Sequence, residues 1–585
     1  MRGGWKRIGL PLRRNVGADA LERRGRDLLA AVGISRKQPS PRLRACGRAE
    51  RRTGLQAIEK AFSFRPDAGE NAQDPAKKGD VNSMKLSTAL TPIRQIDPRM
   101  VSYNIEMTEV TGGTFWKAYT SGQIDGTEEF RFSGELTDFT STKDLVQYYP
   151  PINLYDEKLR AYARKLGPAW IRVSGTWATK TYYDFEGKTQ GVAPEGYASV
   201  LTKAQWIGVL DFVQAVGGKL LISISNCAGD HPNGGALDLT QAKKIFALSH
   251  DYGVDIDAAE FMNEPNMLEF SGALKGYSAA DYARDQDRFF AWVRKNYPRC
   301  LCVGPCSLGE GAQAESFGAG IGLLMQIATT QELMRGTQVP LDVFSYHYYN
   351  GISERLASKM PEGHWNSGDA HTDAYLAVAP NNARIYAPLR DRYVPGGQMW
   401  VTESGDAGGG GDTWASTYLD VPRTLNELGS FAAITDGVIF HNTLASSDYG
   451  FLEHGTFRPR PNYFAAMLWN RLMGQTVYDP ALPARENLHV FAHSRKDGAE
   501  GMAYLAINND LTKAAEIELP TTARRYTLSA GFPRSATMLL NGREMRQDAG
   551  GNLPEMLPVM QAAGRVALAP LTCTFFVLDP EGRRP

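Results

Sequence analysis

The feature that most constrains the fold of this chain is an eightfold alternation of short β-rich runs with longer amphipathic segments, between about residues 99 and 476. Short apolar, β-branched runs are typical of buried strands, and apolar residues at helical spacing predict amphipathic helices between them. The strand candidates are Val101–Ile105, Ala169–Val173, Leu220–Ser225, Ala258–Met262, Leu301–Val303, Val343–Tyr346, Gln398–Thr402 and Gly437–Phe440. This pattern predicts an α/β fold, a (β/α)8 TIM barrel.

The pattern changes after about Val477. Short alternating runs with turn residues between them replace the helical periodicity, and they predict a C-terminal antiparallel β-sandwich domain over residues 477–585. We therefore expect a catalytic barrel over residues 99–476, preceded by a lead-in segment over residues 84–98 that could add a strand to the sandwich.

Residues 1–83 differ from the rest in charge. They hold 19 Lys and Arg against 9 Asp and Glu, whereas the rest of the chain holds 45 against 55. Because this basic segment lacks a sustained apolar face, we expect a disordered extension. A polybasic arm for nucleic acid or membranes is the alternative.

The chain shows no secretory signal pattern and no apolar run of membrane-spanning length. A cytoplasmic protein is expected, with secretion or a periplasmic location as the alternative. We expect a monomer that neither binds nucleic acid nor inserts into a membrane. The six cysteines fit no disulfide framework or zinc-site spacing, so they are interpreted as buried free thiols.

Two glutamates are the strongest catalytic candidates. Glu264 stands in Asn263-Glu264-Pro265 and Glu403 follows Trp400-Val401-Thr402, so each is expected to be the last residue of its strand, the fourth and the seventh. Catalytic side chains of barrels lie at these strand ends, and facing carboxylates are typical of glycoside hydrolysis. We expect Glu264 to be the acid/base, its pKa raised by the charge of Glu403, and Glu403 to be the nucleophile. A retaining mechanism would place the carboxyl groups about 5 to 5.5 Å apart.

The chain resembles clan A glycoside hydrolases of family 79, the heparanase and β-glucuronidase group. The resemblance rests on the two glutamate motifs and on Ala169–Thr176, Leu221–Asn226, Asp342–Asn350, Gly408–Gly411 and Ser447–Tyr449. It implies that backbone N–H groups of Gly409 and Gly410, with the Tyr449 hydroxyl, hold a glucuronate carboxylate. Consecutive glycines can form such an anion-binding concavity, although they also occur in flexible loops.

The resemblance assigns further roles. It implies that Tyr349 hydrogen-bonds Glu403, and that Asn263, His347, Thr176 and Asn226 line the sugar site. Taken alone, the strand residues among these would more often be core residues.

Two positions depart from the family pattern. Glu106 stands where the animal heparanases have Asp, and Trp177 replaces a basic residue with a stacking surface. We therefore expect weaker binding of highly sulfated chains.

The leading hypothesis is a retaining β-D-glucuronidase that cuts inside heparan sulfate, as heparanases do. An exo-acting β-glucuronidase on small glucuronides or oligosaccharides is the first alternative, and a non-catalytic carbohydrate-binding barrel is the second. None of these functions needs a metal or another cofactor.

Overall fold

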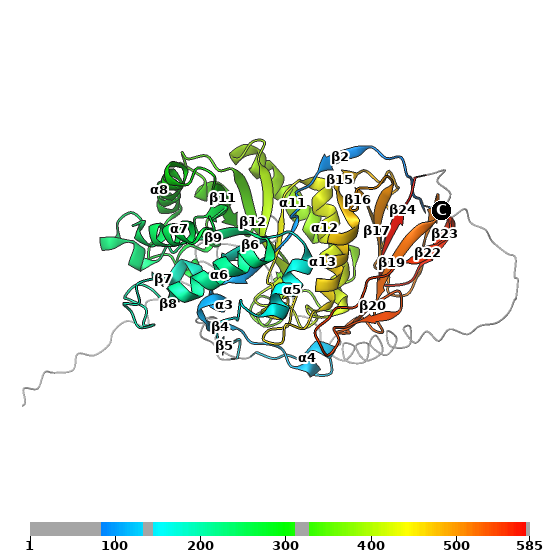
Figure 1. Ribbon diagram of the computed structural model, residues 1–585, viewed down its shortest axis with the longest axis horizontal. Coiled ribbons are helices and arrows are strands. Elements are labelled where there is room, and N and C mark those ends of the chain that lie inside the picture. Colours follow the sequence, from blue (N-terminus) through cyan, green and yellow to red (C-terminus); the bar gives the residue numbers. More distant parts are fainter. Residues whose placement is uncertain (1–83, 133–143, 311–326, 581–585) are drawn as a thin grey trace, which may run out of the picture. The chain divides into compact units, whose positions relative to one another are not determined.

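The computed structural model of the 585-residue chain describes residues 84–132, 144–310 and 327–580 (Figure 1). The predicted basic extension over residues 1–83 lies outside the described residues. Among the helices of the described part, none combines the length and apolar character needed to cross a membrane.

Eight parallel strands close into a barrel, which confirms the predicted (β/α)8 fold. In chain order they are β3 (Val101–Glu106), β6 (Trp170–Ser174), β9 (Lys219–Ser223), β10 (Ala258–Glu260), β11 (Leu301–Ser307), β12 (Val343–Ile352), β13 (Gln398–Gly408) and β14 (Ile439–His441). Each pairs with its predecessor and its successor, and β14 pairs with β3 to close the ring.

Within the described residues, seven longer helices accompany these strands. They are α5 (Glu157–Leu166), α6 (Lys203–Val216), α7 (Thr240–Tyr252), α8 (Ala279–Asn296), α11 (Asp373–Tyr393), α12 (Val421–Ile434) and α13 (Pro461–Leu472); α3 (Met107–Thr111), α4 (Ser121–Asp125) and α10 (Thr330–Leu333) are short. Local sequence sets their ends. Before α6, Thr202 accepts a hydrogen bond from the Gln205 N–H, and Gly217 ends the helix in the left-handed conformation.

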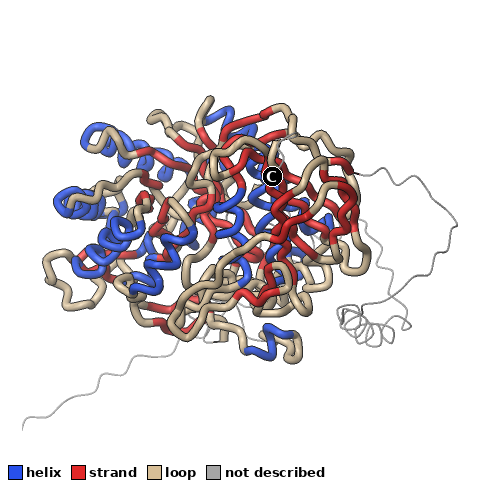
Figure 2. The backbone as a smooth tube through the Cα atoms, turned by 45° about the vertical axis from the view of Figure 1, so that its right-hand side comes forward, coloured by secondary structure: helices blue, strands red, loops and turns tan. Residues whose placement is uncertain are grey.

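The remaining strands form two sheets beside the barrel, one antiparallel pair and one parallel pair. β1 (Met84–Lys85), β18 (Ala515–Leu519) and β23 (Gly564–Leu568) form the small sheet. The large sheet contains β2 (Pro92–Gln95), β15 (Met473–Tyr478), β16 (Leu488–Arg495), β17 (Met502–Asn508), β24 (Thr572–Leu578), β19 (Ala523–Ser529), β20 (Met538–Leu540), β21 (Arg543–Met545) and β22 (Val559–Gln561). The pairs are β4 (Gly113–Trp116) with β5 (Val146–Tyr149), and β7 (Thr181–Asp184) with β8 (Ser199–Thr202). Figure 2 shows helices, in blue, mainly on one side of the molecule and strands, in red, gathered toward the other.

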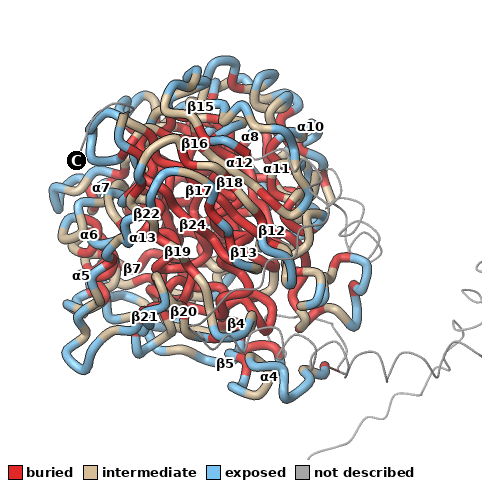
Figure 3. The backbone as a smooth tube through the Cα atoms, turned by 90° about the vertical axis from the view of Figure 1, so that its right-hand side faces the viewer, coloured by how far each residue is buried: buried red, intermediate tan, exposed pale blue. Residues whose placement is uncertain are grey.

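Strand β17 explains how the C-terminal sheets attach to the barrel. Met502, Tyr504 and Ala506 belong to the core between the two sheets, whereas Ala503, Leu505 and Ile507 belong to the core shared with the barrel. Because alternate side chains of a strand point to opposite faces, the large sheet is buried on both. Figure 3 shows β17 and β24 buried at the centre.

The antiparallel C-terminal sheet domain was predicted correctly in type. The domain bounds, including the division between residues 476 and 477, stay predictions. The lead-in segment supplies β1 and β2, which pair with β18 and β15.

Candidate active site

Glu403 does not end its strand as predicted. It lies inside β13, opposite His347 of β12, because these two strands continue pairing as far as Ile352 and Gly408. The glycine run begins at Gly408, the last residue of the same strand, and continues beyond it through Gly411.

Three donors converge on the Glu403 carboxylate. Tyr349 Oη donates to Oε1 at 2.5 Å, Asn442 Nδ2 donates to Oε1 at 3.2 Å, and Arg172 Nη1 donates to Oε2 at 3.2 Å. The predicted hydrogen bond from Tyr349 is therefore present. Hydrogen bonds to an ionised carboxylate are strong and favour the charged form, so this surrounding suits a nucleophile.

Glu264 lies in the loop beyond β10, not on the strand as predicted. Its backbone adopts the left-handed conformation, φ 43° and ψ 55°, which is uncommon for a residue other than glycine. Ser271 Oγ donates to its carbonyl at 2.6 Å and holds this conformation. Backbone strain of this kind clusters at functional sites.

Burial sets the protonation of Glu264. Only 14% of the side chain is exposed, and burial raises the pKa of this carboxyl to about 7, against the opposing effect of Arg172. The prediction named the charge of Glu403 as the cause. That explanation is wrong, because the dominant cause is the removal of the carboxyl from water.

Arg172 ties three strands together beneath the two glutamates. It is fully buried, and it donates from Nε to Glu260 Oε2 at 2.8 Å and from Nη2 to Asn263 Oδ1 at 2.8 Å, besides its contact with Glu403. Since a buried guanidinium needs paired charges, Glu260 and Glu403 fix its position, and it fixes theirs.

His347 joins the two glutamates. Its Nδ1 lies 3.0 Å from Glu264 Oε1 and 3.6 Å from Glu403 Oε2. Its Nε2 lies 3.0 Å from Cys306 Sγ and 3.3 Å from Arg172 Nη2. One carboxylate oxygen of each glutamate and one ring nitrogen all lie within 4.8 Å of one another. Burial lowers the pKa of His347 to about 4, so the ring is neutral near neutral pH.

The glycine run is packed rather than exposed. Gly409, Gly410 and Gly411 all have φ between 84° and 96°, where only glycine is unstrained. Arg355, fully buried, donates to the carbonyls of Gly409 and Gly411 at 3.3 and 2.8 Å.

The same guanidinium also fixes the segment that carries Tyr449. Arg355 pairs with Asp448 at 2.6 Å, and the Asp448 N–H donates to the Gly410 carbonyl at 3.2 Å. Tyr449 Oη accepts from Asn442 Nδ2 at 3.0 Å, so its hydroxyl shares a donor with Glu403. The glycine run and Tyr449 are therefore neighbours, as the predicted anion site requires.

Comparison with known proteins agrees with this geometry. No family model matches the sequence. Heparanase-like protein 1 of Arabidopsis thaliana is 26% identical over 470 residues, which cover 70% of this chain and 82% of that protein. The baicalin-β-D-glucuronidase of Scutellaria baicalensis is 30% identical over 257 residues, 40% of this chain and 49% of that protein.

The structure of a 4-O-α-L-rhamnosyl-β-D-glucuronidase from Fusarium oxysporum superposes with a TM-score of 0.54 at 12% identity, covering 85% of this chain and all of that one. This structural similarity shows that the two proteins share a fold. The chain is a glycoside hydrolase, similar to heparanase-like and glucuronidase proteins. The resemblance to the heparanase and glucuronidase group is thus confirmed.

Two residues central to the site of this hydrolase were not predicted. Arg172 was visible as a charged residue between Ile171 and Val173 inside a strand candidate, and such a residue needs a buried partner. Asn442 follows the eighth strand, where its amide contacts Glu403, Tyr349 and Tyr449. Its sequence neighbourhood, His441-Asn442-Thr443, carries no comparable signal.

Thr176 and Asn226, which were also predicted to contact the sugar, differ in whether they reach the site. Thr176 Oγ1 accepts from Asn263 Nδ2 at 3.5 Å, beside Glu264. Asn226, in contrast, is fully buried, and its amide contacts His231 Nε2 and Met262 Sδ, so it lies behind the site.

Glu106 stands close to both catalytic candidates. It is 3% exposed, and its Oε2 lies against Gly175, where a Cβ atom would approach it to 1.6 Å. Burial, and then the charge of Glu403, raise the pKa of this carboxyl well above its usual range. Both effects favour the neutral form of Glu106.

Glu264, His347 and Glu403 are also the residue types that bind transition metals. The guanidinium of Arg172 contacts both His347 and Glu403, however, and already supplies positive charge at this point. The arrangement thus suits acid and nucleophile chemistry between two carboxyl groups, which was predicted without a metal.

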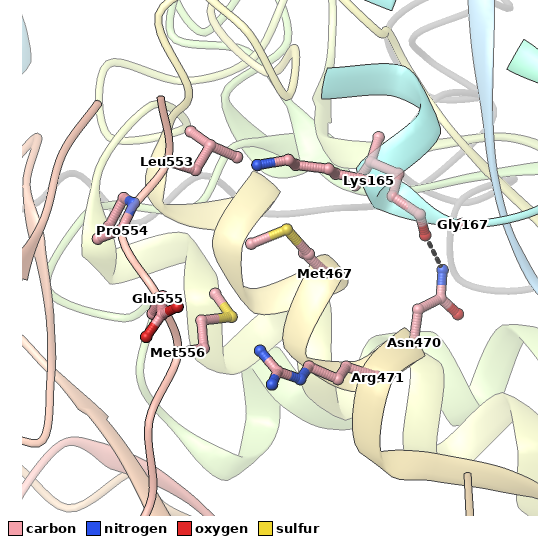
Figure 4. Close-up of a pocket in the computed structure, with 10 residues that line it drawn as sticks. Lys165, Gly167, Met467, Asn470, Arg471, Leu553, Pro554, Glu555 and Met556 are labelled. Carbon is pink, nitrogen blue, oxygen red and sulfur yellow. Dashed lines mark hydrogen bonds between the residues drawn. The ribbon is translucent and has the colours of Figure 1, made fainter. Parts of the chain in front are cut away.

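A separate cavity of about 370 Å³ lies where the ends of α5 and α13 meet the loop around Met556 (Figure 4). Met467 and Met556 line it, with Lys165 and Arg471 beside them. Both cations stand in the last turn of a helix, where they complement the helix dipole. Helices of a barrel run opposite to its strands, so this cavity lies at the end away from the glutamates.

Proposed function

We propose that this hydrolase cleaves β-D-glucuronosyl linkages with retention of configuration, with Glu264 as acid/base and Glu403 as nucleophile. The observation that carries the proposal is the bridge through His347, which brings an oxygen of each carboxyl within 4.8 Å. An inverting enzyme needs carboxyl groups about 6.5 to 9.5 Å apart, to admit a water between them and the sugar.

The surroundings of the two carboxyl groups match these roles. Glu264, with a pKa of about 7, can hold the proton that the leaving oxygen needs. Tyr349, Asn442 and Arg172 support the charge on Glu403. Glu403 attacks the anomeric carbon as Glu264 protonates the departing oxygen. Glu264 then takes a proton from water, which attacks the same carbon and frees Glu403.

A uronic acid is the proposed sugar. Backbone N–H groups at Gly409 and Gly410 and the Tyr449 hydroxyl would bind its carboxylate, while Asn263, Thr176 and Glu106 would meet its hydroxyl groups. The rigid glycine run held by Arg355 supports this assignment, because a fixed concavity of N–H groups binds anions without an ordering cost.

For the polymer, we propose endo cleavage of a heparan-sulfate-like chain. The match to heparanase-like protein 1 over 82% of its length supports this choice. Exo cleavage of small glucuronides is the second candidate. It is favoured by the higher identity to the baicalin-β-D-glucuronidase and by Trp177, an aromatic surface in place of a cation.

Two variants and two substrates test the proposal. Glu403→Ala abolishes turnover, and Glu264→Gln retains activity only on substrates with good leaving groups, since these need no proton. Glu362→Gln, an exposed carboxyl, is the matched control. Wild-type protein is incubated with heparan sulfate and with a chromogenic glucuronide: mid-size fragments mean endo cleavage, and free glucuronate means exo cleavage. Hydrolysis at the wild-type rate by either variant would contradict the assignment of Glu264 as acid/base and Glu403 as nucleophile.

A further inference from the structure

Two successive N–H groups of the glycine run have no partner within the protein. The Gly411 N–H donates to the Ala407 carbonyl at 3.1 Å, whereas the N–H groups of Gly409 and Gly410 make no hydrogen bond to any described residue. Gly410 is nevertheless buried. Since a buried backbone N–H group is almost always paired, these two groups suit an acceptor supplied by a ligand.

Arg355 fixes the direction of one of these groups. Its Nη1 donates to the Gly409 carbonyl at 3.3 Å and to the Gly411 carbonyl at 2.8 Å. The C=O and N–H groups of one trans peptide unit point in opposite directions, because the unit is planar. The Gly410 N–H shares its peptide unit with the Gly409 carbonyl, so it points away from the guanidinium.

The other arm of Arg355 contacts two further loops. Its Nη2 donates to Asp448 Oδ2 at 2.6 Å, next to Tyr449, and to the Lys117 carbonyl at 2.5 Å. The Tyr119 ring lies against the guanidinium, with its centroid 3.7 Å from Cζ. The planar fork of an arginine can hold several acceptors at fixed angles, which a lysine ammonium cannot.

We propose that Arg355 is a positioning residue that sets the preference of this hydrolase for a uronate over the corresponding neutral sugar. Its guanidinium holds the Gly409–Gly410 peptide directly and the Tyr449 segment through Asp448, so that these donors can meet one carboxylate. The proposal rests on the glucuronidase function above. It adds that selectivity depends on a side chain that does not touch the sugar.

The contribution of Arg355 is geometric rather than a direct attraction between charges. Asp448 offsets the charge of the guanidinium, and the two side chains are only 1% and 2% exposed. Three backbone carbonyls, those of Gly409, Gly411 and Lys117, accept from the same guanidinium. A sugar carboxylate therefore meets the backbone that Arg355 orients and not Arg355 itself.

The test compares two iminosugar ligands that differ only at C5, where one carries the carboxylate of a glucuronate and the other the hydroxymethyl group of glucose. Calorimetry gives both dissociation constants, and their ratio isolates recognition of the carboxylate, because the ring and its hydroxyl groups are shared. Thermal melting of each variant checks that it folds.

Two substitutions of Arg355 separate the fork from the charge. In Arg355→Met the carboxylate ligand should bind about 10- to 100-fold more weakly, as expected for lost hydrogen bonds to a charged group, and the neutral ligand should change little. Arg355→Lys keeps the charge beside Asp448 without the fork, so its ratio should lie between those of Arg355→Met and the wild type. If the Met variant does not fold, the Lys variant decides the question.

Arg160→Met is the matched control. Arg160 on α5 also donates to a carbonyl and a carboxylate, those of Leu154 and Asp211, at 2.8 and 2.7 Å, and it lies over the Tyr155 ring. Its variant should keep the wild-type ratio. An unchanged ratio in the Arg355 variants, or an equal fall in the control, overturns the role of Arg355 alone. A wild-type protein that does not prefer the carboxylate ligand overturns the uronate assignment as well.

Discussion

Removal of the Tyr349 hydroxyl tests the electrostatic support of the nucleophile. Tyr349 Oη donates to Glu403 Oε1 at 2.5 Å, and Asn442 Nδ2 contacts both groups. Tyr349→Phe removes this donor and leaves the ring, which stacks on Tyr449 with centroids 6.3 Å apart. Glu403 then keeps Asn442 and Arg172 as donors, so the variant should be weakened rather than inactive.

The magnitude follows from the type of bond. A hydrogen bond to a charged group contributes about 1.5 to 3 kcal/mol, which corresponds to about a 10- to 100-fold loss of kcat/KM.

The assay is kcat/KM for a chromogenic glucuronide across the pH range. Tyr103→Phe on β3 provides a matched control, because the Tyr103 hydroxyl is buried and has no hydrogen-bond partner among the described residues. An unchanged kcat/KM in Tyr349→Phe, or an equal effect in the control, would refute the electrostatic reasoning.

Three further predictions concern the acid, the glycine run and the buried cation. Because Glu264 must be protonated to act and burial raises its pKa to about 7, kcat/KM should fall about tenfold per unit above that pH, and the limb should disappear in Glu264→Gln with an activated substrate. Gly410→Ala should raise KM for glucuronides, since its Cβ would lie 2.6 Å from Trp116 Cβ at φ 93°; Gly396→Ala, with φ 76° but open space, controls for the backbone strain alone. Arg172→Met should lower the melting temperature, because unpaired Glu260 costs about 3 to 5 kcal/mol, whereas loss of the exposed Arg131–Glu129 pair should change it little.

The barrel was predictable because its information is local. Each strand candidate is a short apolar run, and the amphipathic helices expected between the strands are present, α6 and α8 among them. Strand length was not predictable to the same degree. β12 and β13 continue past the apolar runs through tyrosines and glycines, because they pair with each other beyond the barrel rim, and this pairing is a tertiary property.

The residues of the site fall into the same two groups, those that local sequence identifies and those that only tertiary contacts reveal. Glu264, Glu403 and Tyr349 were identified from motifs, and the structure brings them together. Other features of the site depend on which side chains meet in the folded protein. These are the contacts of Arg172 and of the Asn442 amide with Glu403, and the burial that raises the pKa of Glu264. None of these contacts has a fixed sequence spacing, so pattern alone could not supply them.

The balance of charge explains how a mouth with five carboxyl groups could accept an anionic sugar. Burial raises the pKa of Glu264 and of Glu109 to about 7, and that of Glu106 well above its usual range, so burial favours the neutral form of each group. Glu260 is paired with Arg172. Glu403 is then the main unbalanced negative charge, and the tyrosine and asparagine donors partly offset it. A uronate would meet one carboxylate rather than five, at the pH where Glu264 still holds its proton.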